Sequence, residues 1–267
     1  MGSYLGQNFL IDSKVRNYIA EHIQRLYRDL GCEALIEIGP GKGAITKLIE
    51  DISKNFFVIE KDLTLVETLK GGKMEMGRVI QGDVLEIDVG KMLESCIMNH
   101  ASGNKKIDSR KTLVVGNLPY YITSPILRKF FGNGEQNYAG GLFMLQDEVG
   151  QKLRSDAKKK SFLYRLINYA YEVTYLKGVP AKAFRPAPKV KSCLVELKRG
   201  KVERWKGGRE RFLQFLELFA PFSRKTLGAI QKMISKKSGC PFVIPESLQK
   251  KRLEELDRKE LSQILGS

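Results

Sequence analysis

The stretch Ala34-Leu35-Ile36-Glu37-Ile38-Gly39-Pro40-Gly41-Lys42-Gly43 determines how the chain begins to fold. An apolar run leads into a segment rich in glycine, and residues 44–49 that follow have the apolar spacing of a helix. This order predicts a buried strand, a glycine turn and a helix. Glycine lets the backbone approach a ligand closely, and the start of a helix offers unpaired N–H groups. A tight turn that binds nothing has the same pattern, so the following strands must decide between the two interpretations.

Acidic residues follow the next two predicted strands. Residues 56–59 form an apolar run that ends at Glu60, and residues 78–81 lead into Gly82 and Asp83. Ligands of open α/β folds bind at the carboxyl ends of the strands, where these acids are expected to lie. Two carboxylates repel a diphosphate, so the pattern favours a smaller, cationic nucleoside such as S-adenosylmethionine. In that interpretation Glu60 accepts hydrogen bonds from the ribose, Asp83 accepts from the adenine amine, and the glycine turn contacts the methionine end.

A fourth predicted strand ends in the motif Leu113-Val114-Val115-Gly116-Asn117-Leu118-Pro119-Tyr120. Asn117 offers an amide donor and a carbonyl acceptor, which suits the exocyclic amine of a nucleobase, and Tyr120 offers a ring on which a base can stack. Pro119 removes one backbone donor, which leaves nearby carbonyls able to accept. An ordinary strand-to-loop turn is the alternative for this motif when it is taken alone.

Strands and helices alternate with short connections through about residue 199. Further strands are expected at residues 141–145, 172–176 and 192–197. The alternation predicts an α/β fold built on one doubly wound, mainly parallel sheet of seven strands. Residues 99–106 are polar and are expected to form a surface loop.

The end of the chain has a different pattern. After a break at residues 205–208, apolar side chains recur at helical spacing over residues 212–219, and a second helix is expected from Ser223. An apolar stripe of this kind usually packs in a core. We therefore expect an α/β domain over residues 1–200 and a small all-α domain over residues 201–267.

The net charge of +16 is concentrated in one half of the chain. Residues 1–150 contain 18 Lys and Arg against 19 Asp and Glu, whereas residues 151–267 contain 28 against 11, a net charge of +17. A neutral half joined to a basic half suggests a catalytic or ligand-binding unit coupled to a surface for a polyanion, and nucleic acid is the leading candidate. A lysine-rich surface can also serve solubility alone.

The composition argues against several classes of protein. No apolar run approaches the roughly 20 residues that span a bilayer, and the start of the chain lacks the features of a signal peptide. The four cysteines are scattered and form no C-x-x-C pair, so neither a zinc site nor a disulfide framework is indicated. We expect a cytoplasmic protein with no metal and no membrane partner.

Six motifs follow one another in a characteristic order. They are Leu5-Gly6-Gln7-Asn8-Phe9-Leu10, Gly39-Pro40-Gly41-Lys42-Gly43, Ile59-Glu60, Gly82-Asp83, Asn117-Leu118-Pro119-Tyr120 and Phe184-Arg185-Pro186-Ala187-Pro188-Lys189-Val190. In this order the chain resembles, over nearly its whole length, the small-subunit ribosomal RNA adenine dimethyltransferases, the KsgA family. The resemblance implies a Rossmann-like class I, S-adenosylmethionine-dependent methyltransferase domain over residues 1–200, followed by a small helical RNA-binding domain over residues 201–267. It also implies methyl transfer from S-adenosylmethionine to two adjacent adenines near the 3′ end of small-subunit ribosomal RNA, during biogenesis of that subunit.

The resemblance further implies roles for individual residues. The cofactor site would be lined by Asn8, Leu10, Gly39, Glu60, Asp83 and Asn117. The target adenine would be held by Asn117, Leu118 and Tyr120, with Phe184 on its other face. On the sequence alone Phe184 is equally compatible with a place in the core. Lys191 and the pair Gly228-Ala229 depart from the family pattern, which concerns RNA docking and not the cofactor motifs.

The chemistry follows from the residue types in the asparagine motif. An adenine amine is a weak nucleophile because its lone pair is delocalised into the ring. Acceptors at the Asn117 side chain and the Leu118 carbonyl would orient the amine, so that no strong general base is needed. Two alternatives stay open: an enzyme of the macrolide-resistance type that acts on large-subunit RNA, and a ribosome-assembly factor in which catalysis is secondary. We expect a monomer.

Overall fold

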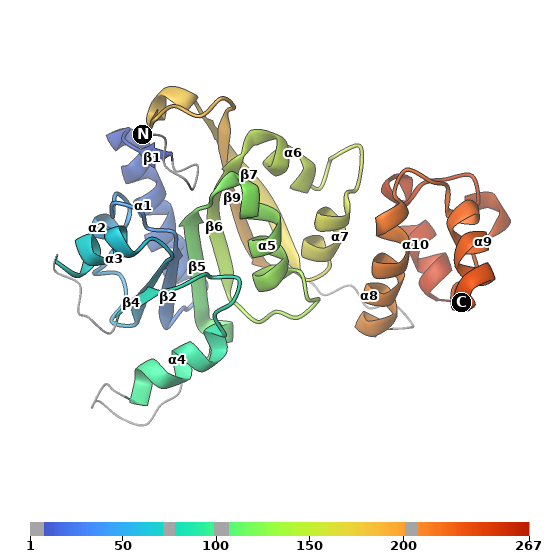
Figure 1. The fold of residues 1–267 in the computed structure, drawn as a ribbon, viewed down its shortest axis with the longest axis horizontal. Helices are drawn as coiled ribbons and strands as arrows, with labels where there is room; N and C mark the ends of the chain where they lie inside the picture. Colours follow the sequence, from blue (N-terminus) through green and yellow to red (C-terminus); the bar gives the residue numbers. More distant parts are fainter. Residues whose placement is uncertain (1–7, 72–77, 99–106, 201–207, 267) are drawn as a thin grey trace.

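The computed structural model describes residues 8–71, 78–98, 107–200 and 208–266. The loop expected at residues 99–106, the beginning of the first motif and most of the break at 205–208 lie outside these ranges. Within them the chain forms one large sheet with helices on both faces, and a further group of helices lies at one end of the molecule (Figure 1).

The large sheet has seven strands, as the sequence predicts. Their spatial order is β4 (Val79–Gln81), β3 (Phe56–Glu60), β2 (Ala34–Ile38), β5 (Thr112–Asn117), β6 (Gly140–Gln146), β9 (Ser192–Arg199) and β7 (Tyr171–Val179). The strands β4, β3, β2, β5 and β6 run parallel to one another, whereas β9 is antiparallel to both β6 and β7. The prediction of a mainly parallel sheet is therefore confirmed.

Helices cover both faces of this sheet, because side chains alternate between the two faces along each strand. Leu113 and Val115 of β5 pack in one hydrophobic cluster, and Val114 between them packs in the other. The first cluster includes α1 (Ser13–Asp29), α2 (Thr46–Ile49) and α3 (Leu63–Lys70). The second includes α4 (Val89–Met98), α5 (Thr123–Phe131), α6 (Asp147–Leu153) and α7 (Phe162–Asn168). With both faces covered, the central strands read as continuous apolar runs.

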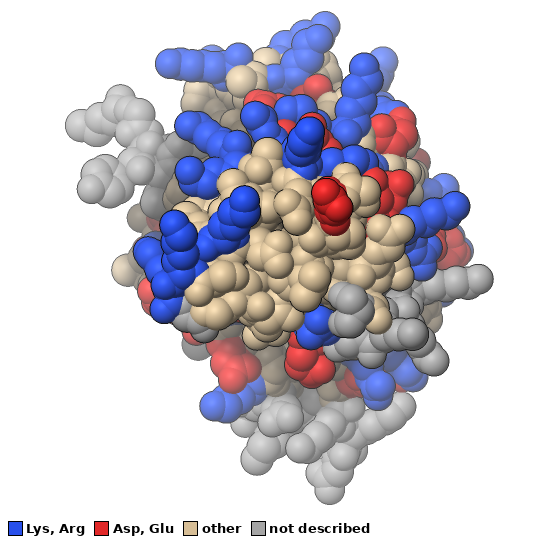
Figure 2. All heavy atoms as spheres, turned by 90° about the vertical axis from the view of Figure 1, so that its right-hand side faces the viewer, with Lys and Arg blue, Asp and Glu red and all other residues tan. Residues whose placement is uncertain are grey.

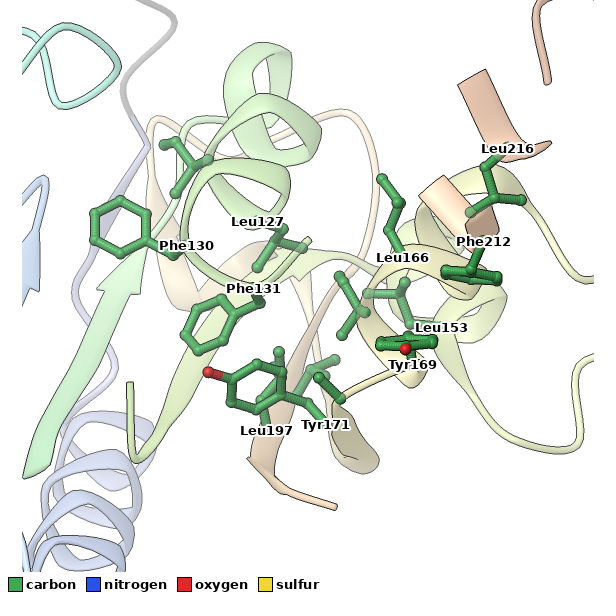
Figure 3. Packing of buried hydrophobic residues seen from close by; sticks show 14 of the residues in the cluster. Leu127, Phe130, Phe131, Leu153, Leu166, Tyr169, Tyr171, Leu197, Phe212 and Leu216 are labelled. Atoms are coloured by element: carbon green, nitrogen blue, oxygen red, sulfur yellow. The ribbon is translucent and has the colours of Figure 1, made fainter. Parts of the chain in front are cut away.

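The helices at the end of the chain extend the second cluster. They are α8 (Gly208–Phe219), α9 (Leu227–Ser238) and α10 (Arg258–Leu265). Phe212 of α8 stacks on Tyr169, which follows α7, with ring centroids 4.6 Å apart and an interplanar angle of 17°. Figure 3 shows these two rings lying face to face beside Leu166. Apolar packing is therefore continuous from the sheet into the helical end.

A buried arginine adds polar contacts to the same junction. The Arg165 guanidinium on α7 donates from Nη2 to the carbonyl oxygens of Leu253 and Leu256, each at 2.7 Å. Both carbonyls belong to the segment that precedes α10, so the cation satisfies backbone acceptors that would otherwise be buried at the interface. The proposed division into residues 1–200 and 201–267 stays a prediction.

A small ribbon was not expected from the sequence. β1 (Phe9–Leu10) pairs antiparallel with β8 (Phe184–Arg185), so that Leu10 lies opposite Phe184. The Ile11 N–H extends the pairing by donating to the Ala183 carbonyl at 2.8 Å. The ribbon holds the beginning of the described chain beside the carboxyl edge of the large sheet.

Candidate active site

A pocket at the carboxyl edge of the sheet brings together most of the predicted site residues. Its walls come from the β1 segment, the glycine turn after β2 and the ends of β3, β4 and β5. All six predicted cofactor residues line it, namely Asn8, Leu10, Gly39, Glu60, Asp83 and Asn117. Leu118 and Tyr120, predicted to hold the target adenine, line the same pocket. Their roles stay predictions.

The glycine turn forms one wall of the pocket, and its backbone has a conformation that residues with side chains rarely adopt. Gly39, Gly41 and Gly43 have φ values of +64°, +57° and +74°, in the left-handed region that glycine adopts at little cost. The Gly39 N–H donates to the Ile59 carbonyl at 2.9 Å, which ties the turn to the end of β3. The shape of the turn is therefore held by a contact within the protein.

Glu60 links this turn to the neighbouring strand. Its carboxylate accepts hydrogen bonds from the backbone N–H groups of Gly41 at 3.1 Å, Lys61 at 2.9 Å and Asp62 at 3.0 Å. A carboxylate has about four acceptor positions, so three bonds fix its orientation and leave roughly one for a ribose hydroxyl. Accepting from both ribose hydroxyls, as expected from the sequence, would require one of the backbone bonds to be shared.

Replacing Glu60 tests this assignment. We expect Glu60→Ala to weaken S-adenosylmethionine binding by about 1–3 kcal/mol, because charge-assisted hydrogen bonds are lost. Isothermal titration calorimetry measures the change directly. Glu67→Ala removes the same charge from an exposed position on α3 and serves as the control. Equal affinities in both variants and the wild type would refute the ribose assignment.

Asp83 follows β4, the strand that pairs with β3, and is already paired with a cation. It accepts from the Leu85 N–H at 2.9 Å and from the Lys61 ammonium at 2.9 Å. The hydrogen bond from Lys61 is the main reason that the pKa of Asp83 is lowered, and the Leu85 N–H lowers it further. Asp83 is thus ionised at neutral pH and can accept from an adenine amine. Lys61 was not identified from the sequence, because its contact with Asp83 depends on the pairing of β3 with β4.

Glu37 is a second residue that the sequence analysis did not identify as part of the site. It lines the pocket from β2, is 3% exposed, and accepts a hydrogen bond from the Thr46 hydroxyl at 2.7 Å. Burial raises the pKa of Glu37 to about 7; the Thr46 hydrogen bond opposes that shift and the nearby Glu60 carboxylate adds to it. A carboxylate within an otherwise apolar strand was the available signal. The pocket therefore contains a carboxyl group that titrates near neutral pH.

The raised pKa of Glu37 predicts a pH-dependent stability. The folded state binds the proton more tightly than the unfolded state, so this contribution to stability is full below the ordinary pKa of 4.5 and is lost as the pH rises through about 7. Glu37→Gln removes the titration and retains an acceptor for Thr46. Between pH 5 and pH 8 we expect the variant to gain on the order of 2 kcal/mol relative to the wild type, measured by urea unfolding. A difference that does not change with pH would contradict the prediction.

Asn117 and Leu118 place two acceptors at the pocket edge. The Asn117 side-chain amide donates to the Asn8 carbonyl at 3.2 Å, which orients the group and leaves its oxygen as the remaining acceptor. The Leu118 N–H donates to the Met144 carbonyl at 3.1 Å, so this backbone is held by β6. Among the described residues no donor is found for the Leu118 carbonyl. Two oxygen acceptors on consecutive residues therefore lie beside the cofactor residues.

The two aromatic residues predicted for base stacking lie in different surroundings. Tyr120 is half-buried, and its hydroxyl shares a 2.6 Å hydrogen bond with Ser192 of β9. Burial raises the pKa of Tyr120, so its hydroxyl is neutral at neutral pH. Phe184 is 3% exposed, packs in the cluster that contains Leu10 and does not line the pocket. Its position is that of a core residue, and stacking by Phe184 stays a prediction.

The departures from the family pattern also have definite positions. Lys191 is exposed, and its backbone carbonyl accepts from the Asp147 N–H at 3.0 Å. At Gly228, an added Cβ would approach Gln249 to 3.0 Å, so close packing within the helical end favours glycine there.

Within the described ranges, no group of three or more His, Cys, Asp or Glu side chains is arranged to hold a metal ion. The helices in those ranges also lack the length and apolar character needed to cross a membrane.

The doubly wound sheet, the glycine turn and the acids at the strand ends define a class I methyltransferase fold. A family model described as ribosomal RNA adenine dimethylase matches residues 2–237. The chain belongs to this family, and is thus an S-adenosylmethionine-dependent ribosomal RNA adenine dimethyltransferase.

Curated relatives are similar in sequence to this protein over most of the chain. The chain is 34% identical over 263 residues to the ribosomal RNA small subunit methyltransferase A of Chlorobium phaeobacteroides, covering 97% of this chain and 88% of the relative. It is 30% identical to the protein of the same name from Fusobacterium nucleatum, covering 86% and 81%.

Two solved structures share the fold at lower sequence identity. A dimethyladenosine transferase from Plasmodium falciparum is 19% identical with a TM-score of 0.62, and covers 95% of this chain and 94% of its own. The 23S rRNA methyltransferase ErmE is 20% identical with a TM-score of 0.60, and covers 97% and 100%. At these identities the two structures support the fold and not a particular substrate.

Proposed function

We propose that this enzyme dimethylates the exocyclic amines of two adjacent adenines near the 3′ end of small-subunit ribosomal RNA. The observation that carries the proposal is the pair of acceptors at Asn117 and Leu118, which lies beside the residues predicted to hold the cofactor. An exocyclic amine has two N–H donors, so two acceptors on consecutive residues match it. The names of the curated relatives, at 30–34% identity, favour the small subunit.

The acceptors explain how an unreactive amine can attack. Bound S-adenosylmethionine supplies an electrophilic methyl group on its sulfonium. Hydrogen bonds to the Asn117 side-chain oxygen and the Leu118 carbonyl direct both N–H groups of adenine away from that methyl, so that the nitrogen lone pair is directed towards it. The same two oxygens stabilise the positive charge that develops on the nitrogen as the bond between the methyl group and sulfur breaks, and the methylated amine then releases one proton to the solvent. The Tyr120 ring supports the flipped base by stacking, which offsets the cost of removing it from the RNA.

The charge of the second half of the chain supports an RNA partner. The helical end carries exposed cations at Arg224, Lys225, Lys232, Lys236, Lys237 and Lys250. Figure 2, which faces this end of the molecule, shows many lysine and arginine side chains, with acidic ones among them, around a mostly uncharged middle. Cations on a surface bind phosphates and position an RNA without reading its sequence. This arrangement suits the ribosomal RNA of a precursor of the small subunit.

The two competing functions have weaker support. The likeness to a 23S rRNA methyltransferase is a likeness of fold at 20% identity. A pure assembly factor would not need the bonded arrangement of Glu60, Asp83 and Asn117 in one pocket, although a role in assembly is compatible with catalysis.

We also infer that the protein acts in the cytoplasm as a monomer, and light scattering after size-exclusion chromatography tests the oligomeric state.

One experiment distinguishes these functions. The protein is incubated with labelled S-adenosylmethionine and either small subunits, large subunits or free ribosomal RNA that lack the modification, and the labelled base is mapped. We expect dimethyladenosine at two adjacent adenines of the small-subunit RNA. Label confined to the large subunit would identify the macrolide-resistance activity, and the absence of label in every substrate would favour the assembly factor.

A further inference from the structure

Tyr121 places an exposed aromatic ring at the edge of the active-site pocket. The residue lines the pocket together with Asn117 and Tyr120, yet it is 60% exposed. Other large apolar side chains in the described ranges are also well exposed, but they do not line this pocket: Ile11, Leu48, Leu63, Val190, Phe222 and Val243. Tyr121 is therefore distinguished by its position and not by its exposure alone.

The backbone beneath Tyr121 is held by hydrogen bonds within the protein. Residues 120–122 form a short 3-10 turn, in which the Ile122 N–H donates to the Pro119 carbonyl at 3.1 Å. The Thr123 hydroxyl donates to the same carbonyl at 3.1 Å. A ring on such a turn can bind a ligand without a large cost in backbone ordering.

The rings of Tyr120 and Tyr121 point in different directions. Consecutive side chains on a 3-10 turn are rotated by about 120° from each other. Tyr120 is tied to Ser192 through its hydroxyl. Within the described residues, Tyr121 makes no hydrogen bond and no contact with another ring. The Tyr120 ring is therefore held against β9, whereas the Tyr121 ring lines the pocket without an aromatic partner among the described residues.

Cations accompany the exposed ring. Lys42 and Lys61 both line the pocket, and the Lys42 ammonium lies 4.8 Å from the centroid of the Phe9 ring. The Asp83 carboxylate, and to a smaller extent the Tyr121 hydroxyl, raise the pKa of Lys61, so these groups lie within electrostatic reach of one another. An aromatic face beside cations is the combination that binds single-stranded nucleic acid.

We propose that Tyr121 stacks on the base of the nucleotide next to the target adenine. The inference rests on the proposed function, in which an adenine of an RNA strand leaves its stack to enter the pocket. Its neighbour then loses one stacking partner, and the Tyr121 ring takes the place of that partner. Because every base has a π face, this contact requires that a base be present and does not select which base it is.

The test combines a protein variant with an RNA lesion. Small subunits are reconstituted with RNA in which the nucleotide on one side of the target adenine, then the other, is replaced by an abasic residue. Initial rates give KM and kcat for the wild type, Tyr121→Ala and Tyr121→Phe, and Leu63→Ala serves as an exposed control outside the pocket. We expect Tyr121→Ala to raise KM about tenfold on intact RNA and Tyr121→Phe to stay within about twofold, because the ring face is retained.

The decisive comparison uses the abasic substrates. For the lesion on one side of the adenine, we expect the KM of the wild type to rise by about the same factor as the KM of Tyr121→Ala rises on intact RNA. When the variant acts on that damaged RNA, we expect no further rise in KM, because both changes remove the same contact. Losses that multiply for lesions on both sides, or a wild-type KM in Tyr121→Ala, would overturn the proposal. A parallel rise in the Kd of S-adenosylmethionine would assign the ring to the cofactor and overturn it as well. Failure of the wild type to methylate intact subunits would instead refute the proposed function.

Discussion

Asn117→Ala should lower the single-turnover rate of methyl transfer by about 100-fold or more and leave RNA affinity nearly unchanged. The side-chain amide of Asn117 donates a hydrogen bond to the Asn8 carbonyl, and this contact fixes the direction of the side-chain oxygen. It contacts an amine whose charge develops only during transfer, and such contacts lower the barrier more than they strengthen binding. The rate is measured in a methyl-transfer time course beside a filter-binding titration.

Two controls separate catalysis from indirect effects. The assay is repeated at saturating S-adenosylmethionine, because Asn117 also lines the cofactor pocket, and we expect saturation not to restore the rate. Asn133→Ala removes an amide that bonds to Glu135 in the loop after α5, and this variant should methylate normally. If Asn117→Ala transfers methyl groups at the wild-type rate, the adenine is held elsewhere and the catalytic assignment is wrong.

Phe212→Ala should reduce the free energy of unfolding by about 3–5 kcal/mol, the usual cost of deleting a large buried ring. The side chain is 2% exposed and stacks on Tyr169, so the substitution removes both buried area and a ring pair. Since apolar packing is continuous across this junction, we expect sheet and helical end to unfold together in one transition. Urea unfolding followed by circular dichroism gives the free energy.

Phe222→Ala is the matched control, because Phe222 belongs to the same helical end but is 36% exposed. It should cost less than about 1 kcal/mol. Hydrogen exchange then shows which parts of the Phe212→Ala protein open. Exchange confined to residues 208–266, with a protected sheet, would contradict a single cooperative core and would support an independent domain at the end of the chain.

The elements with the strongest periodicity could be predicted from the sequence. Strands β2 and β3 are buried on both faces, so each reads as an apolar run, and Glu60 stands out where β3 ends. The ribbon of β1 and β8 could not be found in this way, because two residues give no period. Because the ribbon could not be predicted, the surroundings of Phe184 could not be predicted either, since a residue in so short a strand shows no preferred face.

Contacts between side chains of distant segments could not be predicted from the sequence either. The acids Glu60 and Asp83 were expected together because parallel strands end at one edge of a sheet. The bond from Lys61 to Asp83 depends on how a long side chain crosses that edge, which no local pattern specifies. Glu37 could have been noticed as a charge within an apolar strand, but its partner Thr46 and its burial emerge only from the fold.

The reversed direction of β9 determines which loops are suitable for redesign. Parallel strands offer the ligand the loops that follow them, whereas β9 offers the loop that precedes it. Ser192, its first residue, therefore lies opposite Val179 and Gln146 at the active edge, and Arg199 lies at the far edge. An engineer who wishes to change which RNA is accepted should graft loops into residues 186–191. Insertions just after Arg199 would alter the route to the helical end and leave the reaction site untouched.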